Sequence, residues 1–202
     1  SLNETTKQLL EIDEKTKSAT PKFSLPIVKK DRALPYADSI SFLNKYPENM
    51  KFSKIEKRGK IAIFIGCMSN YTYTNTGDSL IKILKKLEYD VFIPKKQLCC
   101  GAPAYFTGAF DTVDYLTKKN IEYFESWIDD VEAVIIPEAT CSAMINKDWE
   151  HYLHDQPEWK QRAIKISKKI FLATKWLENS TELKNILAKN GKKFDKMVTY
   201  HD

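Results

Sequence analysis

The amino-acid sequence predicts an α/β fold in which a mostly parallel, open sheet is covered by helices on both faces. Short apolar runs rich in β-branched residues alternate along the chain with longer segments whose apolar side chains recur at helical spacing. Strands that alternate with helices are joined by right-handed crossovers, which make neighbouring strands parallel. With 202 residues, of which 43% are hydrophobic, the chain is long enough to build one such domain.

The expected α/β domain spans residues 57–202, and residues 1–56 form a lead-in connector that is partly extended. The connector contains four prolines and has no regular period except for a short helical stretch over Glu4–Lys17. The domain opens with a buried strand, Ile61–Ile65, in which every side chain is apolar. The helix that follows, Asp78–Leu87, has leucine and isoleucine on one side and lysine on the other.

The alternation of strands and helices continues through the rest of the chain. A short strand over Tyr89–Pro94 is followed by a long amphipathic helix over Phe110–Ile128, and a third strand covers Ala133–Ile136. We expect three further helices and a last strand at Trp149–Leu153, Lys165–Leu177, Thr181–Lys189 and Met197–Tyr200. This order of elements is typical of a Rossmann-like fold, which binds ligands outside the carboxyl ends of its strands.

All four cysteines follow the ends of predicted strands. Cys67 comes after the first strand, the neighbours Cys99 and Cys100 after the second, and Cys141 after the third, at intervals of 31 and 40 residues. Because the carboxyl ends of parallel strands meet at one edge of a sheet, we expect the loops that carry these cysteines to converge. Successive residues of a strand face opposite ways, so only a loop can present the two neighbouring thiols together.

Four thiolates on converging loops are a suitable ligand set for a metal. They can hold a 4Fe-4S cluster, a 2Fe-2S cluster or a tetrahedral zinc ion. Inert buried cysteines are the alternative, whereas a disulfide framework is disfavoured because 202 residues can build an ordinary core. A strained, easily reduced disulfide between Cys99 and Cys100 would give a third possibility, thiol-disulfide chemistry.

The cysteine spacing resembles that of the cysteine-rich CCG domain family. In this family a first cysteine, a Cys-Cys-Gly group and a Cys-x-x-Cys pair follow one another, as Cys67, Cys99, Cys100 and Cys141 do here. The family includes a subunit of heterodisulfide reductase, the iron-sulfur subunit of glycolate oxidase and the lactate-utilisation iron-sulfur protein. The Gly-Cys-Met and Cys-Cys-Gly-Ala-Pro sequences are most similar to the glycolate oxidase iron-sulfur subunit. The resemblance covers the chain from Ile61 to its end.

The resemblance implies an electron-transfer role rather than a catalytic one. Cys67, Cys99, Cys100 and Cys141 would bind an iron-sulfur cluster, with 4Fe-4S as the first choice and zinc as the alternative metal. The chain would pass electrons from a flavoprotein that oxidises a 2-hydroxy acid, glycolate or lactate, toward membrane quinone. The oxidation itself would belong to the flavoprotein, so no residue of this chain is expected to be catalytic.

The resemblance also implies a larger assembly. Family members carry two such modules, and the second opens with a phrase similar to Tyr200-His201-Asp202. We therefore expect the chain to be part of a longer subunit that continues into a second module. The implied partners are the flavoprotein oxidase subunit and further iron-sulfur modules of the same complex. The expected location is the cytoplasm, with the complex reaching the inner face of the membrane through its partners.

One departure from the family pattern affects the site. The last family cysteine is replaced by Met144, so one thiolate is missing, and the interval before Cys141 is slightly long. A methionine thioether can ligate a soft metal, but methionine more often fills a gap in a core. Loss of a ligand favours an alternative function: a structural or interaction domain whose cysteines hold zinc or no metal.

Other features of the sequence carry no clear function. The net charge of +5 comes from lysines interleaved with acidic residues, and no nucleic-acid motif is present, so we expect no nucleic-acid partner. No apolar run has the length of a membrane span. His151 and His154 share a helical face and are expected at the surface. Four aromatic residues beside the cysteines are expected mainly to pack, although they could shield a cluster or shape a partner surface: Tyr71, Tyr73, Tyr105 and Phe106.

Overall fold

The computed structural model describes the chain over residues 10–13, 15–22, 33–35, 37–54, 59–191, 195–197 and 199. Its centre is a five-stranded sheet with the strand order β4-β6-β5-β7-β8. The strands are β4 (Asn49–Met50), β5 (Lys60–Ile63), β6 (Asp90–Phe92), β7 (Ala133–Ile136) and β8 (Ile170–Leu172). Strands β5 to β8 are parallel, whereas β4 runs antiparallel to β6 at one edge. The predicted, mostly parallel sheet is therefore confirmed.

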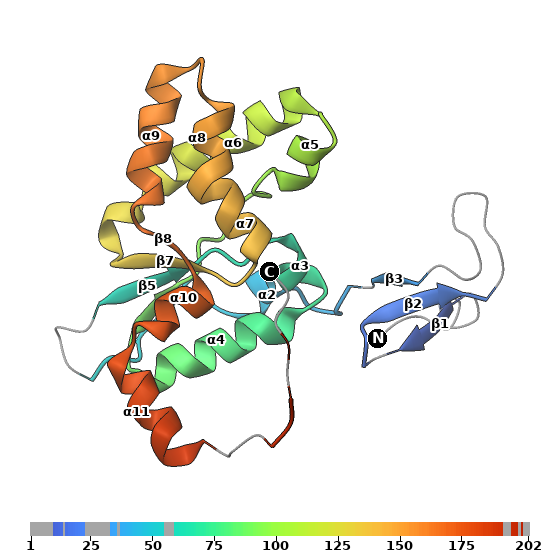
Figure 1. The fold of residues 1–202 in the computed structure, drawn as a ribbon, viewed down its shortest axis with the longest axis vertical. Helices are drawn as coiled ribbons and strands as arrows, with labels where there is room; N and C mark the ends of the chain where they lie inside the picture. The colour runs from blue at the N-terminus through green and yellow to red at the C-terminus, as the bar shows by residue number, and fades with distance from the viewer. Residues whose placement is uncertain are drawn as a thin grey trace.

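Helices cover both faces of this sheet, as the sequence predicted (Figure 1). The helices of one face are α4 (Thr74–Lys86), α10 (Ala173–Glu178) and α11 (Thr181–Asn190), and those of the other are α6 (Phe110–Glu125), α8 (Trp149–Tyr152) and α9 (Pro157–Ser167). Strand β5 packs on both sides, with Ala62 in one buried cluster and Ile61 and Ile63 in the other. None of the described helices combines the length and the apolar character needed to cross a membrane.

Three short helices stand at the carboxyl ends of the strands. Helix α3 (Cys67–Tyr71) follows β5, α5 (Ala102–Phe106) follows β6, and α7 (Ala139–Ala143) follows β7. A 3-10 helix, Ile128–Asp130, comes after α6. Helix α7 continues into a π-helical turn, Met144–Asp148, and then into α8. Such turns are rare and often occur at functional sites, which draws attention to the segment that follows the last cysteine.

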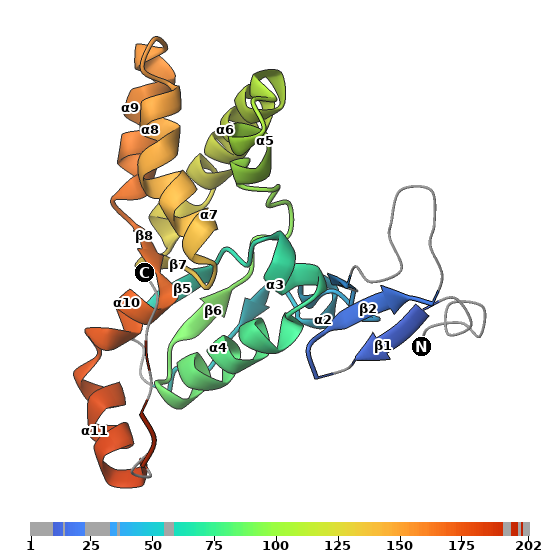
Figure 2. The ribbon, with the colours of Figure 1, turned by 45° about the vertical axis from the view of Figure 1, so that its right-hand side comes forward.

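The helix predicted over Glu4–Lys17 is wrong. Strands β1 (Leu10–Asp13) and β2 (Ser18–Pro21) form an antiparallel hairpin there, and β3 (Leu34–Pro35) pairs with β2. The first part of the predicted helix, up to residue 9, lies outside the described residues. In Figures 1 and 2 the hairpin stands apart from the five-stranded sheet.

The turn of this hairpin explains the error. The Asp13 carboxylate accepts hydrogen bonds from the backbone N–H groups of Lys15 and Thr16 at 2.9 and 3.2 Å. Lys17 then adopts a positive φ of 53°. An aspartate that bonds the backbone two or three residues on closes a turn rather than a helix, and the spacing of apolar residues gives no sign of this.

The single helix predicted over Lys165–Leu177 is also wrong. Helix α9 ends at Ser167, and the edge strand β8 separates it from α10. Strand β8 contains Ile170, Phe171 and Leu172 and pairs in parallel with β7. Its apolar, partly β-branched sequence suits a strand, and pairing with an open sheet edge outweighs the helical pattern on either side.

Two further predictions concern the ends of the domain. For the last predicted strand, Met197–Tyr200, residues 198 and 200 lie outside the described part, and Met197 and Thr199 belong to no strand. At the other end, β4 pairs with β6, and Phe42 of helix α2 (Phe42–Lys45) is fully buried in the core. The sheet domain therefore includes residues that the sequence placed in the lead-in connector.

The packing of Phe42 against Gly77 leads to a prediction about stability. A Cβ atom added at Gly77 would lie 2.4 Å from two ring carbons of Phe42 and 2.8 Å from Cδ1 of Ile65. Gly77→Ala in an exposed helix would be stabilising, but here overpacking should lower the free energy of unfolding by about 1–3 kcal/mol. Urea denaturation measures this change, with Ser79→Ala in the same helix as the control. Greater stability of Gly77→Ala would contradict the prediction.

Candidate metal centre

The carboxyl ends of β5, β6 and β7 bring the four cysteines to one edge of the sheet, where α3, α5 and α7 begin (Figure 2). Cys67 is the first residue of α3, Cys99 and Cys100 precede α5, and Cys141 lies in α7. The structure thus gathers the cysteines as the strand order predicts. The expectation that loops carry all of them is wrong for Cys67 and Cys141, because short helices begin at or just after these strand ends.

Cys100 and Cys141 form the buried half of the site. Their Sγ atoms are 3.3 Å apart, and both side chains are buried. Cys141 also lies against Gly66, since a Cβ atom added to this glycine would be 3.1 Å from the Cys141 Sγ. Gly66 directly precedes Cys67, so the ends of the first and third strands meet beside the Cys141 thiol.

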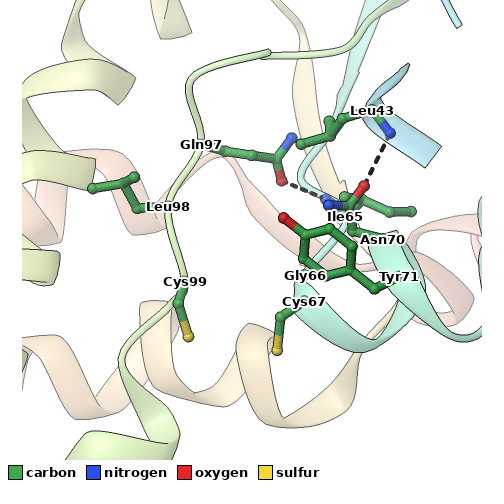
Figure 3. Close-up of a pocket in the computed structure, with 9 residues that line it drawn as sticks. All are labelled: Leu43, Ile65, Gly66, Cys67, Asn70, Tyr71, Gln97, Leu98 and Cys99. Carbon is green, nitrogen blue, oxygen red and sulfur yellow. Dashed lines mark hydrogen bonds between the residues drawn. The ribbon is translucent and has the colours of Figure 1, made fainter. Parts of the chain in front are cut away.

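Cys67 and Cys99 form the open half of the site. Both are half-buried, and their sulfur atoms point the same way from separate segments (Figure 3). They border a cavity of about 250 Å³ that is also lined by Leu43, Ile65, Gly66, Asn70, Tyr71, Gln97 and Leu98. This side of the centre is therefore accessible, whereas Cys100 and Cys141 are covered by the core.

Crowding and burial stabilise the protonated thiols. A hydrogen bond with the Cys141 thiol, together with burial, raises the pKa of Cys100 to about 12. A hydrogen bond with Cys100 and burial raise the pKa of Cys99. Burial and the nearby charges of Cys99 and Glu138 raise the pKa of Cys67. A cation that compensates the negative charge would therefore favour the thiolate forms at this site.

Residues 99–102, which contain the two adjacent cysteines, are here called the vicinal segment. Two of its backbone N–H groups oppose the rise in pKa at two of the sulfur atoms. The N–H of Gly101 donates to the Cys99 sulfur, and the N–H of Ala102 donates to the Cys100 sulfur. Each of these hydrogen bonds lowers the pKa of its thiol, because it stabilises the thiolate. N–H donors of this kind also adjust the electron density of a thiolate that is bound to a metal.

The donor set fits a metal bound by thiolates. Soft sulfur ligands from three strand ends, two of them with backbone N–H donors, suit an iron-sulfur cluster or a tetrahedral zinc ion. Among the described residues, no three Cys, His, Asp or Glu side chains already form a group that could hold a metal ion. Binding a metal therefore requires the cysteine side chains to turn toward a common centre.

Two buried residues that the sequence analysis missed fix the vicinal cysteines. Asn120 on α6 accepts a hydrogen bond from the Leu98 N–H at 3.1 Å and donates one to the Cys99 carbonyl oxygen at 2.9 Å. Trp149 on α8 donates from Nε1 to the Cys100 carbonyl oxygen at 3.0 Å. A polar residue such as Asn120 on the apolar face of a predicted helix was the available signal, because buried polar groups need partners.

Gln97 and Glu138 hold the three strand ends together. The Gln97 side chain accepts a hydrogen bond from the Ile65 N–H and donates one to the Pro94 carbonyl, both at 2.8 Å. The Glu138 carboxylate accepts from the N–H and the hydroxyl of Ser69 at 2.7 and 2.6 Å. Helix α3 is thus tied to the end of β7, and no sequence pattern marked these residues.

Met144 lies in the core, and His151 and His154 lie at the surface. Met144 is completely buried in the same apolar cluster as Cys100 and Cys141, which suits a core residue. Its Cε would be 3.7 Å from a Cβ atom added to Gly101, so the methionine packs beneath the vicinal segment. His151 and His154 are exposed, as predicted.

The aromatic residues beside the site differ from the prediction. Tyr105 packs against the core and against the ring of Phe106, at a centroid distance of 5.7 Å. Tyr71 and Phe106, however, expose 54% and 71% of their surface, and Tyr73 is exposed as well. The expectation that most of the four would pack is therefore wrong: Tyr71 and Phe106 are the last residues of the short helices α3 and α5, and Tyr73 directly precedes α4.

The site and the fold together define a class of cysteine-rich protein. Residues 61–146 match the profile of the family described as CCG, a cysteine-rich domain. All four cysteines of the site lie within this range. This part of the chain is therefore similar to the CCG cysteine-rich domain, as its cysteine spacing predicted.

The chain is similar to several curated bacterial proteins named lactate utilization protein A. It is 30% identical to the one from Bacillus licheniformis over 142 residues, which cover 70% of this chain and 56% of that protein. It is 31% identical to the one from Exiguobacterium sp. over 141 residues, which cover 70% and 55%. The chain thus spans little more than half the length of these relatives. No solved structure matches it significantly.

Proposed function

We propose that Cys67, Cys99, Cys100 and Cys141 bind an iron-sulfur cluster through which the chain transfers electrons in the oxidation of a 2-hydroxy acid. The observation that carries the proposal is the convergence of four thiols from three strand ends, with a buried contact of 3.3 Å between two of them. Similarity to proteins named for lactate utilization supports lactate as the substrate of the system, and glycolate is the second choice.

A 4Fe-4S cluster is the proposed cofactor, because it accepts four thiolate ligands. When bound, it would supply one-electron transfer at the edge of the sheet. Different residues of the chain would have different roles around the cluster. Cys100 and Cys141 hold the protected side, the N–H groups of Gly101 and Ala102 stabilise thiolates, and the cavity beside Cys67 leaves a side open toward a redox partner.

The proposed partners are a flavoprotein that oxidises the 2-hydroxy acid and further iron-sulfur modules of the same complex. The exposed Tyr71 beside the cavity at Cys67 and Cys99 suits contact with a protein partner. We propose a cytoplasmic location, with membrane contact only through partners, and no nucleic-acid binding. The substrate chemistry would belong to the flavoprotein, so this chain itself is proposed to be non-catalytic.

Two other functions are each supported by one observation. Met144 in place of a family cysteine favours a zinc-bound or metal-free structural domain, because one thiolate fewer is available. The contact between Cys100 and Cys141 favours thiol redox chemistry, in which these two sulfurs rather than the vicinal pair would be the first to react. Both functions predict a chain that takes up no iron.

Metal analysis separates these functions. The chain is purified without oxygen, supplied with iron and sulfide, and measured for iron, acid-labile sulfide, zinc, and absorbance and EPR spectra. We expect iron and sulfide in proportion to the chain, with a reducible cluster. Tightly held zinc under the same conditions would contradict electron transfer. Absence of all metals, with a disulfide joining Cys100 and Cys141 after mild oxidation, would favour thiol chemistry instead.

A further inference from the structure

The carbonyl oxygen of Cys100 is held by a side chain that is itself completely buried. Trp149 has no exposed surface, and its Nε1–H donates to this oxygen at 3.0 Å. Trp149 begins α8, directly after the π-helical turn that continues from the helix of Cys141. A continuous helical segment therefore supplies one thiol of the site and fixes the backbone that carries another.

The geometry of the peptide bond passes this constraint to the next residue. The carbonyl of Cys100 and the N–H of Gly101 belong to one peptide unit, and none of the described peptide bonds is cis. In a planar trans peptide these two groups point in opposite directions. Holding the oxygen on Trp149 therefore turns the Gly101 N–H the other way, where it donates to the Cys99 sulfur.

Two features keep this peptide in place. Gly101 has a φ of 94°, a left-handed conformation that glycine adopts without strain. Asn120, which is 1% exposed, holds the backbone just before Cys100: it accepts a hydrogen bond from the Leu98 N–H and donates one to the Cys99 carbonyl oxygen. The vicinal segment is thus held by side chains of α6 and α8, and it cannot rotate without breaking buried hydrogen bonds.

We propose that Trp149 is a positioning residue that, through the Cys100 carbonyl, aims the Gly101 N–H at the Cys99 sulfur. The consequence for redox potential rests on the proposed cluster. A hydrogen bond to a ligand sulfur withdraws electron density and favours the reduced cluster, so it raises the reduction potential. Trp149 would act in this way without touching the metal.

The first test uses the metal-free chain and does not depend on the cluster. Trp149→Phe removes the indole N–H and keeps an aromatic ring in the core. We expect hydrogen exchange of the Gly101 amide, followed by NMR, to become about tenfold faster than in the wild-type chain. The Ile65 amide, which bonds Gln97 at the same sheet edge, should keep its wild-type exchange rate.

The chain contains a matched control. Trp127 lies in the same apolar cluster, but its buried Nε1–H has no hydrogen-bond partner among the described residues. Trp127→Phe makes the same chemical change without removing a hydrogen bond, so it should leave Gly101 exchange unaltered. Unchanged exchange in Trp149→Phe, or equal acceleration in both variants, would overturn the proposal.

If Trp149→Phe does not fold, Trp149 can be replaced by its benzothiophene analogue, which keeps the shape of the side chain but lacks the N–H. Exchange of the Gly101 amide should then be faster than in the wild-type chain for the same reason.

The second test measures the iron-loaded chain. We expect the cluster of Trp149→Phe to have a more negative midpoint potential than those of the wild type and Trp127→Phe, at equal iron content. Equal potentials in all three would overturn the redox consequence. A wild-type chain that takes up no iron would reject the proposed function, while amide exchange would still decide whether Trp149 positions the Gly101 N–H.

Discussion

Cys100→Ser is expected to abolish incorporation of the cluster. Cys100 is 2% exposed, and its Sγ lies 3.3 Å from that of Cys141, so a ligand lost here cannot be replaced by water from the open side. A serine hydroxyl is a poor substitute, because soft thiolates bind iron-sulfur clusters far better than a neutral oxygen. Iron and acid-labile sulfide per chain after anaerobic reconstitution should fall about tenfold or more.

Met144→Leu is the control for this result. Met144 lies in the same apolar cluster as Cys100, and the change to leucine conserves volume, so the fold should tolerate it. If Met144 only fills the core, this variant should retain wild-type iron. Wild-type iron in Cys100→Ser would remove Cys100 from the ligand set. Loss of iron in Met144→Leu, in a chain that still folds, would instead make the methionine sulfur a ligand.

The part of the fold that could be predicted from the sequence is the part that depends on local pattern. Every side chain from Ile61 to Ile65 is apolar because this segment is buried on both faces of the sheet, with Ile61 and Phe64 in different clusters. The convergence of the cysteines was equally accessible, because Cys67, Cys99 and Cys141 each follow a strand of a parallel sheet.

The remainder depends on contacts between distant segments. The strand at Ile170 forms only because β7 offers it a free edge, and the hairpin turn depends on one carboxylate, that of Asp13. Trp149 and Asn120 were missed for the same reason. In the sequence each looks like an ordinary helix residue. Each acquires a role only when the fold places it against the backbone of a cysteine that is distant in the sequence: Trp149 bonds Cys100, 49 residues away, and Asn120 bonds Cys99, 21 residues away.

Gly66→Ala is expected to damage both the fold and the site. Gly66 has φ 73° and ψ 163°, a conformation that residues with a side chain rarely adopt. An added Cβ would also lie 2.9 Å from Cγ of Glu138 and 3.1 Å from Sγ of Cys141. Strain and overpacking together should lower the free energy of unfolding by about 3 kcal/mol, measured by urea denaturation of the metal-free chain.

Gly108→Ala is the control that separates the cost of backbone strain from the effect of Gly66→Ala on the metal centre. Gly108 also has a positive φ, 76°, but a Cβ added there would have no described atom within 4 Å. It should cost about 1 kcal/mol from backbone strain and leave iron uptake unchanged. Gly66→Ala should lose more stability and also bind less iron, because the Cys141 sulfur must move aside. If both variants lost the same stability and kept full iron, the close approach of Gly66 to Cys141 would have no role in building the centre.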